Sequence, residues 1–230
     1  MRRGMAEALR RARREGRAAV LFTPLDGGAQ RLLDAAGLEL LAMTDPELAA
    51  AGHEALRSDR AAVLPRQGEL LVTPHNPPLR LCVVGAVHIS ESLCAMARQC
   101  GYAVTVIDPR SAFLRAERFP GVQLVGEWPQ AAFAQLQPDA RTAVVLLTHD
   151  TKIDDPALMA VLATPAFYIG ALGSSRTHAK RLERLAAAGV GEADRARIHG
   201  PAGLSIGARS PAEIAVSVLA QLTQVLRGQR

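Results

Sequence analysis

Residues 81–90 read LCVVGAVHIS, which predicts a buried strand, a tight turn and the start of a helix. The first four residues are all apolar, as in a strand that is covered on both faces of a parallel sheet. Gly85 suits the sharp turn that follows. The apolar residues of the helix recur at intervals of four, three and four: Ile89, Leu93, Met96 and Cys100. A strand, a turn and a helix in this order predict a Rossmann-like α/β domain.

The chain beyond this unit alternates predicted strands with predicted helices. Strands are expected at 103–109, 122–126, 140–150 and 166–173. Helices are expected at 154–162, at 177–189 and from 211 onward. Ser210 and Glu213 form a capping box before the last of these helices. Such alternation predicts a doubly wound parallel sheet over residues 79–230.

Residues 1–78 predict a small N-terminal α/β domain. Its expected elements are a basic helix at 5–15, a strand at 18–23, a helix from Thr44 to about Leu56 and a hairpin of AAVLP and ELLVT. The segment TPHNPPLR, residues 73–80, holds three prolines, which resist both a helix and a central strand. We therefore expect a linker there, between domains at 1–78 and 79–230.

The composition argues against membrane and nucleic-acid partners. Of 230 residues, 49% are apolar, and no apolar run approaches the roughly 18 residues that a membrane helix needs. The net charge is +5, but only 3% of the residues are aromatic, so platforms for stacking bases are lacking. We expect no nucleic acid, no membrane, no signal peptide and a cytoplasmic location. The cysteines form no CxxC pair and are expected to be buried thiols: Cys82, Cys94 and Cys100.

Ligands of doubly wound sheets bind beyond the carboxyl ends of the strands, where the strand order reverses. The residues expected at this edge are 85–90, 108–110, 148–155 and 170–176. Gly85 and Ser90 fit a G-x-G-x-x-G/A dinucleotide fingerprint, but Val87 replaces its middle glycine and would crowd a pyrophosphate. Asp108 lies 23 residues after Gly85, where it could accept a ribose hydroxyl or could simply end a buried strand.

Two histidines follow strands in this half of the chain. His88 comes after the first strand, and Thr148, His149 and Asp150 come after the fourth. Both histidines could face one cleft and bind metal or move protons there, or each could be a structural residue. No tight ligand spacing supports a metal site. The carboxylates nearby are expected to cap a helix: Asp154 and Asp155.

The loop GALGSSRTH, residues 170–178, has the residue types of an anion site. Gly173 permits an unusual backbone, and Ser174 and Ser175 supply hydroxyls. Arg176 adds a planar cation at a helix N-terminus, where phosphates and carboxylates bind. A glycine turn followed by a serine helix cap would use the same residues, so both interpretations stay open.

Five blocks of sequence occur together and in order: VGAVHIS, VTVIDPRSAFLRAERFP, LTHDTKIDDPAL, YIGALGSSRTHAKRLERL and HGPAGLSIGARSPAEIAVSVLA. Over about residues 80–226 the chain resembles the XdhC/CoxI family, which are accessory proteins of xanthine dehydrogenase and CO dehydrogenase-type molybdenum hydroxylases. The resemblance implies a Rossmann-like, non-catalytic domain. Such a chaperone would bind molybdenum cofactor and help to deliver it, in sulfurated form, to an apo-enzyme.

The resemblance places the cofactor at the residues that follow the strands. Molybdopterin phosphate, or the cytosine dinucleotide form of the cofactor, would lie at the helix N-termini near Gly85 and Ser174. Asp108 would accept a ribose hydroxyl, Arg176 would neutralise phosphate, and the two histidines would lie near the metal end. The full set of expected cofactor-binding residues is Gly85, His88, Asp108, Arg110, Thr148, His149, Asp150, Gly173, Ser174, Ser175 and Arg176.

The partner implied is a molybdenum hydroxylase apo-enzyme, with a sulfurtransferase and a second copy of the chain as further candidates. Residues 1–78 lack the family's G-S-x-P-R and G-G-G-x-L-E-like blocks, so no cofactor role is carried over to them. Two alternatives remain. An NAD(P)-dependent oxidoreductase rests on fold analogy alone, and Val87 argues against NAD(P) binding. A protein-docking module would keep the fold with an occluded nucleotide site.

Overall fold

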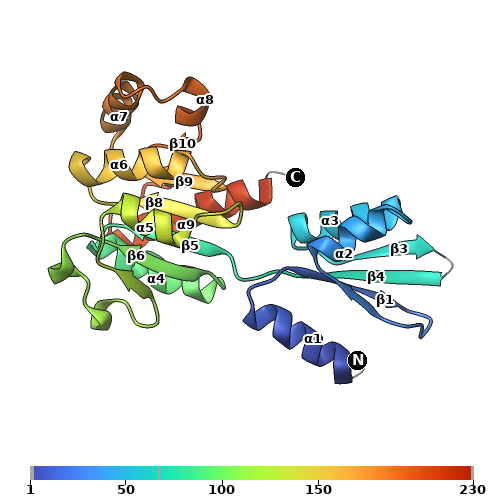
Figure 1. Ribbon diagram of the computed structural model, residues 1–230. Coiled ribbons are helices and arrows are strands. Elements are labelled where there is room, and N and C mark those ends of the chain that lie inside the picture. The colour runs from blue at the N-terminus through green and yellow to red at the C-terminus, as the bar shows by residue number, and fades with distance from the viewer. Residues whose placement is uncertain (1–2, 67, 229–230) are drawn as a thin grey trace. The chain divides into compact units, whose positions relative to one another are not determined.

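The computed structural model describes residues 3–66 and 68–228 (Figure 1). The chain divides into two compact units between Pro77 and Pro78. Each unit has its own sheet and its own buried apolar cluster. Among the described residues, no helix combines the length and the apolar character needed to cross a bilayer.

The first unit is built on a four-stranded antiparallel sheet in the order β2-β1-β4-β3. Its elements are α1 (Arg3–Arg14), β1 (Ala19–Pro24), β2 (Arg31–Leu33), α2 (Ala35–Ala42), α3 (Pro46–Ser58), β3 (Ala62–Arg66) and β4 (Gly68–His75). The core lies between the sheet and α2 and α3, around Phe22, Leu38 and Val72. The predicted hairpin is β3 and β4, whereas β2 and α2 were not foreseen because both are short.

The expected linker at 73–80 begins too early, because Thr73, Pro74 and His75 belong to β4. Pro74 pairs with Val20 of β1 in the antiparallel ladder. The hairpin partner β3 accompanies β4 only as far as Val72, so one side of the strand is unpaired at Pro74. A proline is tolerated in a strand where its missing N–H faces no neighbour.

The second unit is a six-stranded parallel sheet in the order β10-β9-β8-β5-β6-β7. Numbered along the chain, this is the 3-2-1-4-5-6 order of dinucleotide-binding folds, which confirms the predicted Rossmann-like class. Its elements are β5 (Arg80–Val84), α4 (His88–Gln99), β6 (Ala103–Ile107), β7 (Gln123–Val125), α5 (Pro129–Leu136), β8 (Thr142–Leu146), α6 (Thr151–Leu162), β9 (Tyr168–Ala171), α7 (Ser175–Ala187), α8 (Glu192–Arg195), β10 (Ile198–His199) and α9 (Pro211–Gly228).

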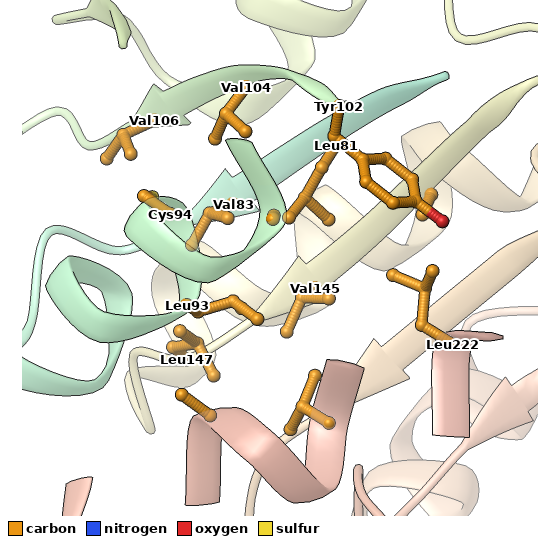
Figure 2. Close-up of a cluster of buried hydrophobic side chains, with 14 of the residues drawn as sticks. Leu81, Val83, Leu93, Cys94, Tyr102, Val104, Val106, Val145, Leu147 and Leu222 are labelled. Carbon is orange, nitrogen blue, oxygen red and sulfur yellow. The ribbon is translucent and has the colours of Figure 1, made fainter. Parts of the chain in front are cut away.

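Strand β5 is covered on both faces, as its unbroken apolar run predicted. Leu81 and Val83 point into one buried cluster, while Cys82 and Val84 point into the cluster on the opposite face. Figure 2 shows the first of these clusters, where side chains of α4 and α9 meet those of the sheet. Because the side chains alternate between the two faces, all four of them are buried in a core. This burial holds the strand in place, and the turn that follows it therefore lies at the edge of a rigid sheet.

The apolar face of α4 is rotated from the predicted one. Leu93, Cys94 and Ala97 are buried, together with the polar Ser90. Cys100, expected on that face and expected to be buried, is exposed because the helix ends at Gln99 and Cys100 lies beyond its last turn. The other two cysteines are buried, and burial raises the pKa of Cys82 to about 11 and of Cys94 to about 12.

Candidate functional site

The strand order reverses between β5 and β8, so the edge beyond these two strands is the expected ligand position. Gly85 follows β5 there, with a φ of +109°, a conformation that favours glycine. A Cβ at this position would lie 2.7 Å from Cγ2 of Thr148, which follows β8. The close approach of the two strand ends therefore requires a glycine at Gly85.

The backbone N–H groups of the turn after β5 are hydrogen-bonded to other groups of the protein. Ala86 N donates to Oδ2 of Asp108 at 2.8 Å, and Val87 N donates to the Ser90 hydroxyl at 2.9 Å. In dinucleotide-binding domains this turn and helix N-terminus approach the pyrophosphate. Two donors that a pyrophosphate could use are thus already engaged, and a β-branched side chain stands at Val87.

Asp108 is a fully buried carboxylate that joins the first turn to the end of β6. Arg110 donates to it from Nε at 2.9 Å and from Nη2 at 2.8 Å, and the Arg110 backbone N–H donates at 2.9 Å. Burial pushes the pKa of Asp108 up, but the bonds from Arg110 and from Ala86 N outweigh it and hold that pKa below its usual value. To accept a ribose hydroxyl, as predicted, Asp108 would have to exchange one of these partners.

A hollow of about 270 Å³ lies beside this turn, next to Ala86 and Val87. The other residues that line it are His88, Arg110, Phe113 and Arg118. The Arg110 guanidinium lies 4.8 Å from the centre of the Phe113 ring, which shields that face of the Asp108 ion pair. The His88 side chain is 89% exposed, with Nδ1 3.7 Å from Glu91 Oε1.

A second hollow, of about 260 Å³, lies between α6 and α7. His149 lines it, at a φ of +69° that is uncommon for a non-glycine residue. His88 does not line this hollow, so the structure does not bring the two histidines into one cleft as expected. The residues around the second hollow are His149, Thr151, Asp154, Arg176, Thr177, Lys180, Arg181 and Arg184.

Asp154 does not cap a helix, contrary to the sequence-based prediction. Helix α6 begins three residues earlier, at Thr151, and its cap is Asp150, which accepts from Lys152 N at 2.9 Å. Asp154 is 3% exposed and accepts a hydrogen bond from the Thr148 hydroxyl. Burial raises its pKa, against the opposing effects of Thr148, Arg181 and His149.

Asp155 does not cap the helix either. It accepts two hydrogen bonds from Arg184 of α7, at 2.6 Å from Nε and 2.8 Å from Nη2. This bidentate ion pair ties α6 to α7 along one side of the second hollow. The positive charge of Arg184 is consequently balanced within the protein.

The loop before α7 contains the serine helix cap that its sequence allowed, while the anion site stays a prediction. Gly173 has a φ of +139°, and the Ser174 hydroxyl caps α7 by accepting from Thr177 N at 3.1 Å. Ser175 and Arg176 are exposed in the first turn of the helix. The serine cap is thus present, and it leaves Arg176 at the rim of the second hollow.

Three cationic residues of this site were not predicted from the sequence: Lys180, Arg181 and Arg184. A usable signal was present, because Arg176, Lys180 and Arg184 recur at intervals of four and so share one face of a helix. The described residues contain no group of three or more His, Cys, Asp and Glu side chains arranged for a metal. Of the described side chains, four cationic ones line the second hollow: Arg176, Lys180, Arg181 and Arg184.

Comparison with known protein families places this unit clearly. A family model described as the XdhC Rossmann domain matches residues 81–222. A crystal structure of a xanthine dehydrogenase from Bacillus halodurans superposes with a TM-score of 0.60 at 18% identity, covering 97% of this chain and 96% of that one. At this low sequence identity, the structural similarity supports the fold alone.

Three curated bacterial proteins are similar in sequence. The uncharacterized protein YqeB of Escherichia coli K12 is 30% identical over 76% of this chain and 31% of its own length. The molybdenum cofactor insertion chaperone PaoD of the same strain is 32% identical over 65% of this chain and 41% of its own length. A protein of Bacillus subtilis 168, named as a probable xanthine dehydrogenase subunit, is 34% identical over 65% of this chain and 43% of its own length. The chain thus matches less than half of each relative's length.

Proposed function

The chain belongs to the XdhC family, whose Rossmann domain it carries at residues 81–222, and on this premise we propose that it is an accessory protein of a molybdenum hydroxylase. It would bind molybdenum cofactor and assist its insertion into an apo-enzyme such as xanthine dehydrogenase, without itself catalysing a reaction. The PaoD relative, named as a molybdenum cofactor insertion chaperone, supports this role. A sulfurtransferase and a second copy of the chain stay predicted partners.

The cationic hollow at the carboxyl edge of the sheet is the observation that carries the proposal. Molybdopterin bears a phosphate, and its fit can be judged from the donors that the hollow provides. Arg181 is 2% exposed, yet its Nε and Nη1 have no hydrogen-bond partner among the described residues. Buried donors of this kind fit an anionic ligand.

Arg176 and Thr177 at the start of α7, with Lys180 one turn on, would hold the phosphate end of the cofactor. His149 lies at the same hollow and would border the bound group. When bound, the cofactor supplies the molybdenum centre that the partner enzyme uses. The residues of this chain would bind, orient and shield it.

The two alternatives gain less support from the geometry. An NAD(P)-dependent oxidoreductase needs pyrophosphate at the first turn, where Ala86 N and Val87 N are already engaged. Micromolar binding of NADH would favour that alternative. A role as a protein-docking module does not explain the positive charges that line the second hollow.

A maturation experiment tests the accessory role. A host that lacks its own XdhC-type proteins would produce a molybdenum hydroxylase with or without this chain. We expect the hydroxylase to contain several-fold more molybdenum, and to be correspondingly more active, when the chain is present, because insertion then proceeds from a protected cofactor. Equal molybdenum content in both preparations, with the chain shown to be folded and abundant, would contradict the role.

A further inference from the structure

Arg181 of α7 is unusual, because it is the largest of the fully buried side chains among the described residues and it carries a charge. Its Nη2 donates to the Leu172 carbonyl at 2.7 Å and lies 3.8 Å from Asp154 Oδ2. Nε and Nη1 are buried and have no hydrogen-bond partner in the described part of the chain. Burial lowers the pKa of Arg181, in keeping with the cost of keeping a charge there. Unsatisfied buried donors on a cation carry a substantial free-energy cost.

The carboxylates near Arg181 do not remove this cost. Asp155 is bound by Arg184 in a bidentate pair. Asp154 is bound by the Thr148 hydroxyl, and its distance of 3.8 Å from Arg181 is too long for a hydrogen bond. Arg181 therefore keeps two donors that have no partner among the described residues, and its side chain lines the hollow.

The other side chains of the hollow add positive charge. Arg176 and Lys180 line it, and Asp154 is the one acidic side chain among its described lining residues. Thr177 lies in the first turn of α7, where the helix dipole favours an anion. The hollow thus combines a buried guanidinium, two exposed cations and a helix N-terminus.

We propose that this hollow, with Arg181 at its base, is a binding site for the phosphate group of a phosphate monoester. Nη2 has a second hydrogen beside the one that it donates to Leu172, and this hydrogen together with Nε or Nη1 would match two oxygens of a phosphate. Lys180 and Arg176 would contact the remaining oxygens from the rim. The inference rests on the proposed function for the identity of the whole ligand, while binding of phosphate itself depends only on these residues.

The test uses the full chain and inorganic phosphate as the probe. Binding is measured by calorimetric titration and by the rise in melting temperature, against sodium chloride at equal ionic strength, since salt screens exposed charges. We expect saturable stabilisation by phosphate beyond that of chloride. No difference between the two salts would overturn the inference.

Lys180→Gln and Lys152→Gln form a matched pair, because these are the two lysines of the chain and both are exposed. Lys180 lines the hollow, whereas Lys152 does not. Loss of a charged donor should weaken phosphate binding about tenfold in Lys180→Gln. Lys152→Gln should stay within about twofold of the parent, since it removes the same charge outside the hollow. Equal affinities in the two variants would overturn the assignment.

Arg181→Gln is expected to abolish both phosphate binding and the stabilisation by phosphate. If this variant does not fold, the comparison of Lys180→Gln with Lys152→Gln tests the site. The failure of this inference and that of the proposed function are distinguishable. Phosphate binding without any effect on hydroxylase maturation would contradict the accessory role alone. If a Lys180→Gln variant with weakened phosphate affinity supports maturation as well as the parent does, phosphate binding in the hollow is not needed for the accessory role.

Discussion

Gly85→Ala is expected to lower the free energy of unfolding by about 3 kcal/mol, because two costs add at one position. The backbone φ of +109° is strained for any side chain, and the new Cβ would lie 2.7 Å from Thr148 Cγ2 and 3.3 Å from Thr148 N. Since Thr148 lies against the end of β5, the strand ends would have to separate. Urea denaturation of the full chain measures the loss.

Gly101→Ala provides the matched control. Gly101 also has a positive φ, of +86°, but a Cβ there would meet no atom of the described residues within 4 Å. Its expected loss is about 1 kcal/mol, from backbone strain alone. Equal losses at Gly85 and Gly101 would show that the close approach of the two strand ends contributes nothing.

Asp108→Ala is expected to cost about 3 kcal/mol at neutral pH. The substitution leaves the Ala86 N–H without its acceptor and removes three bonds made by Arg110. Because Arg110 is 40% exposed, its own charge can be solvated, so the loss stays below that of a wholly buried pair. Urea denaturation at pH 7 measures it, with Asp150→Ala as a control that removes an exposed helix cap worth about 1 kcal/mol.

The pH dependence of this loss follows from the lowered pKa of Asp108 in the folded state. An acid whose folded pKa is depressed stabilises the protein above its unfolded pKa of about 4. That contribution is lost as the pH falls through the folded pKa. The difference between parent and Asp108→Ala should therefore shrink below about pH 4, and a constant difference down to pH 3 would contradict the ion-pair account.

The sequence was sufficient to predict the Rossmann-like unit because its signals are local. The run at 81–84 is apolar on both strand faces, and both faces are buried. Elements of few residues, such as β2, α8 and β10, were missed because two to four residues show no period. The strand order could not be derived from periodicity, since it depends on which strands meet in space.

The candidate site was predicted in part. Strand-end positions such as Gly85, Thr148 and Arg176 follow from the rule that ligands bind at the carboxyl edge. His88 and His149 are separated because α4 and α6 cover opposite faces of the sheet, which no spacing reveals. Burial of Arg181 was equally hidden, because an arginine in a basic helix is ordinarily assigned to the solvent face.

The central claim is that this chain handles molybdenum cofactor, and cofactor content tests it most directly. The chain would be purified from cells that make the cofactor and from a matched strain that cannot. Molybdenum would be measured by mass spectrometry, and pterin by the fluorescence of its oxidised form. We predict both molybdenum and pterin with the first preparation and neither with the second. A folded protein without molybdenum or pterin from cofactor-producing cells would contradict the claim.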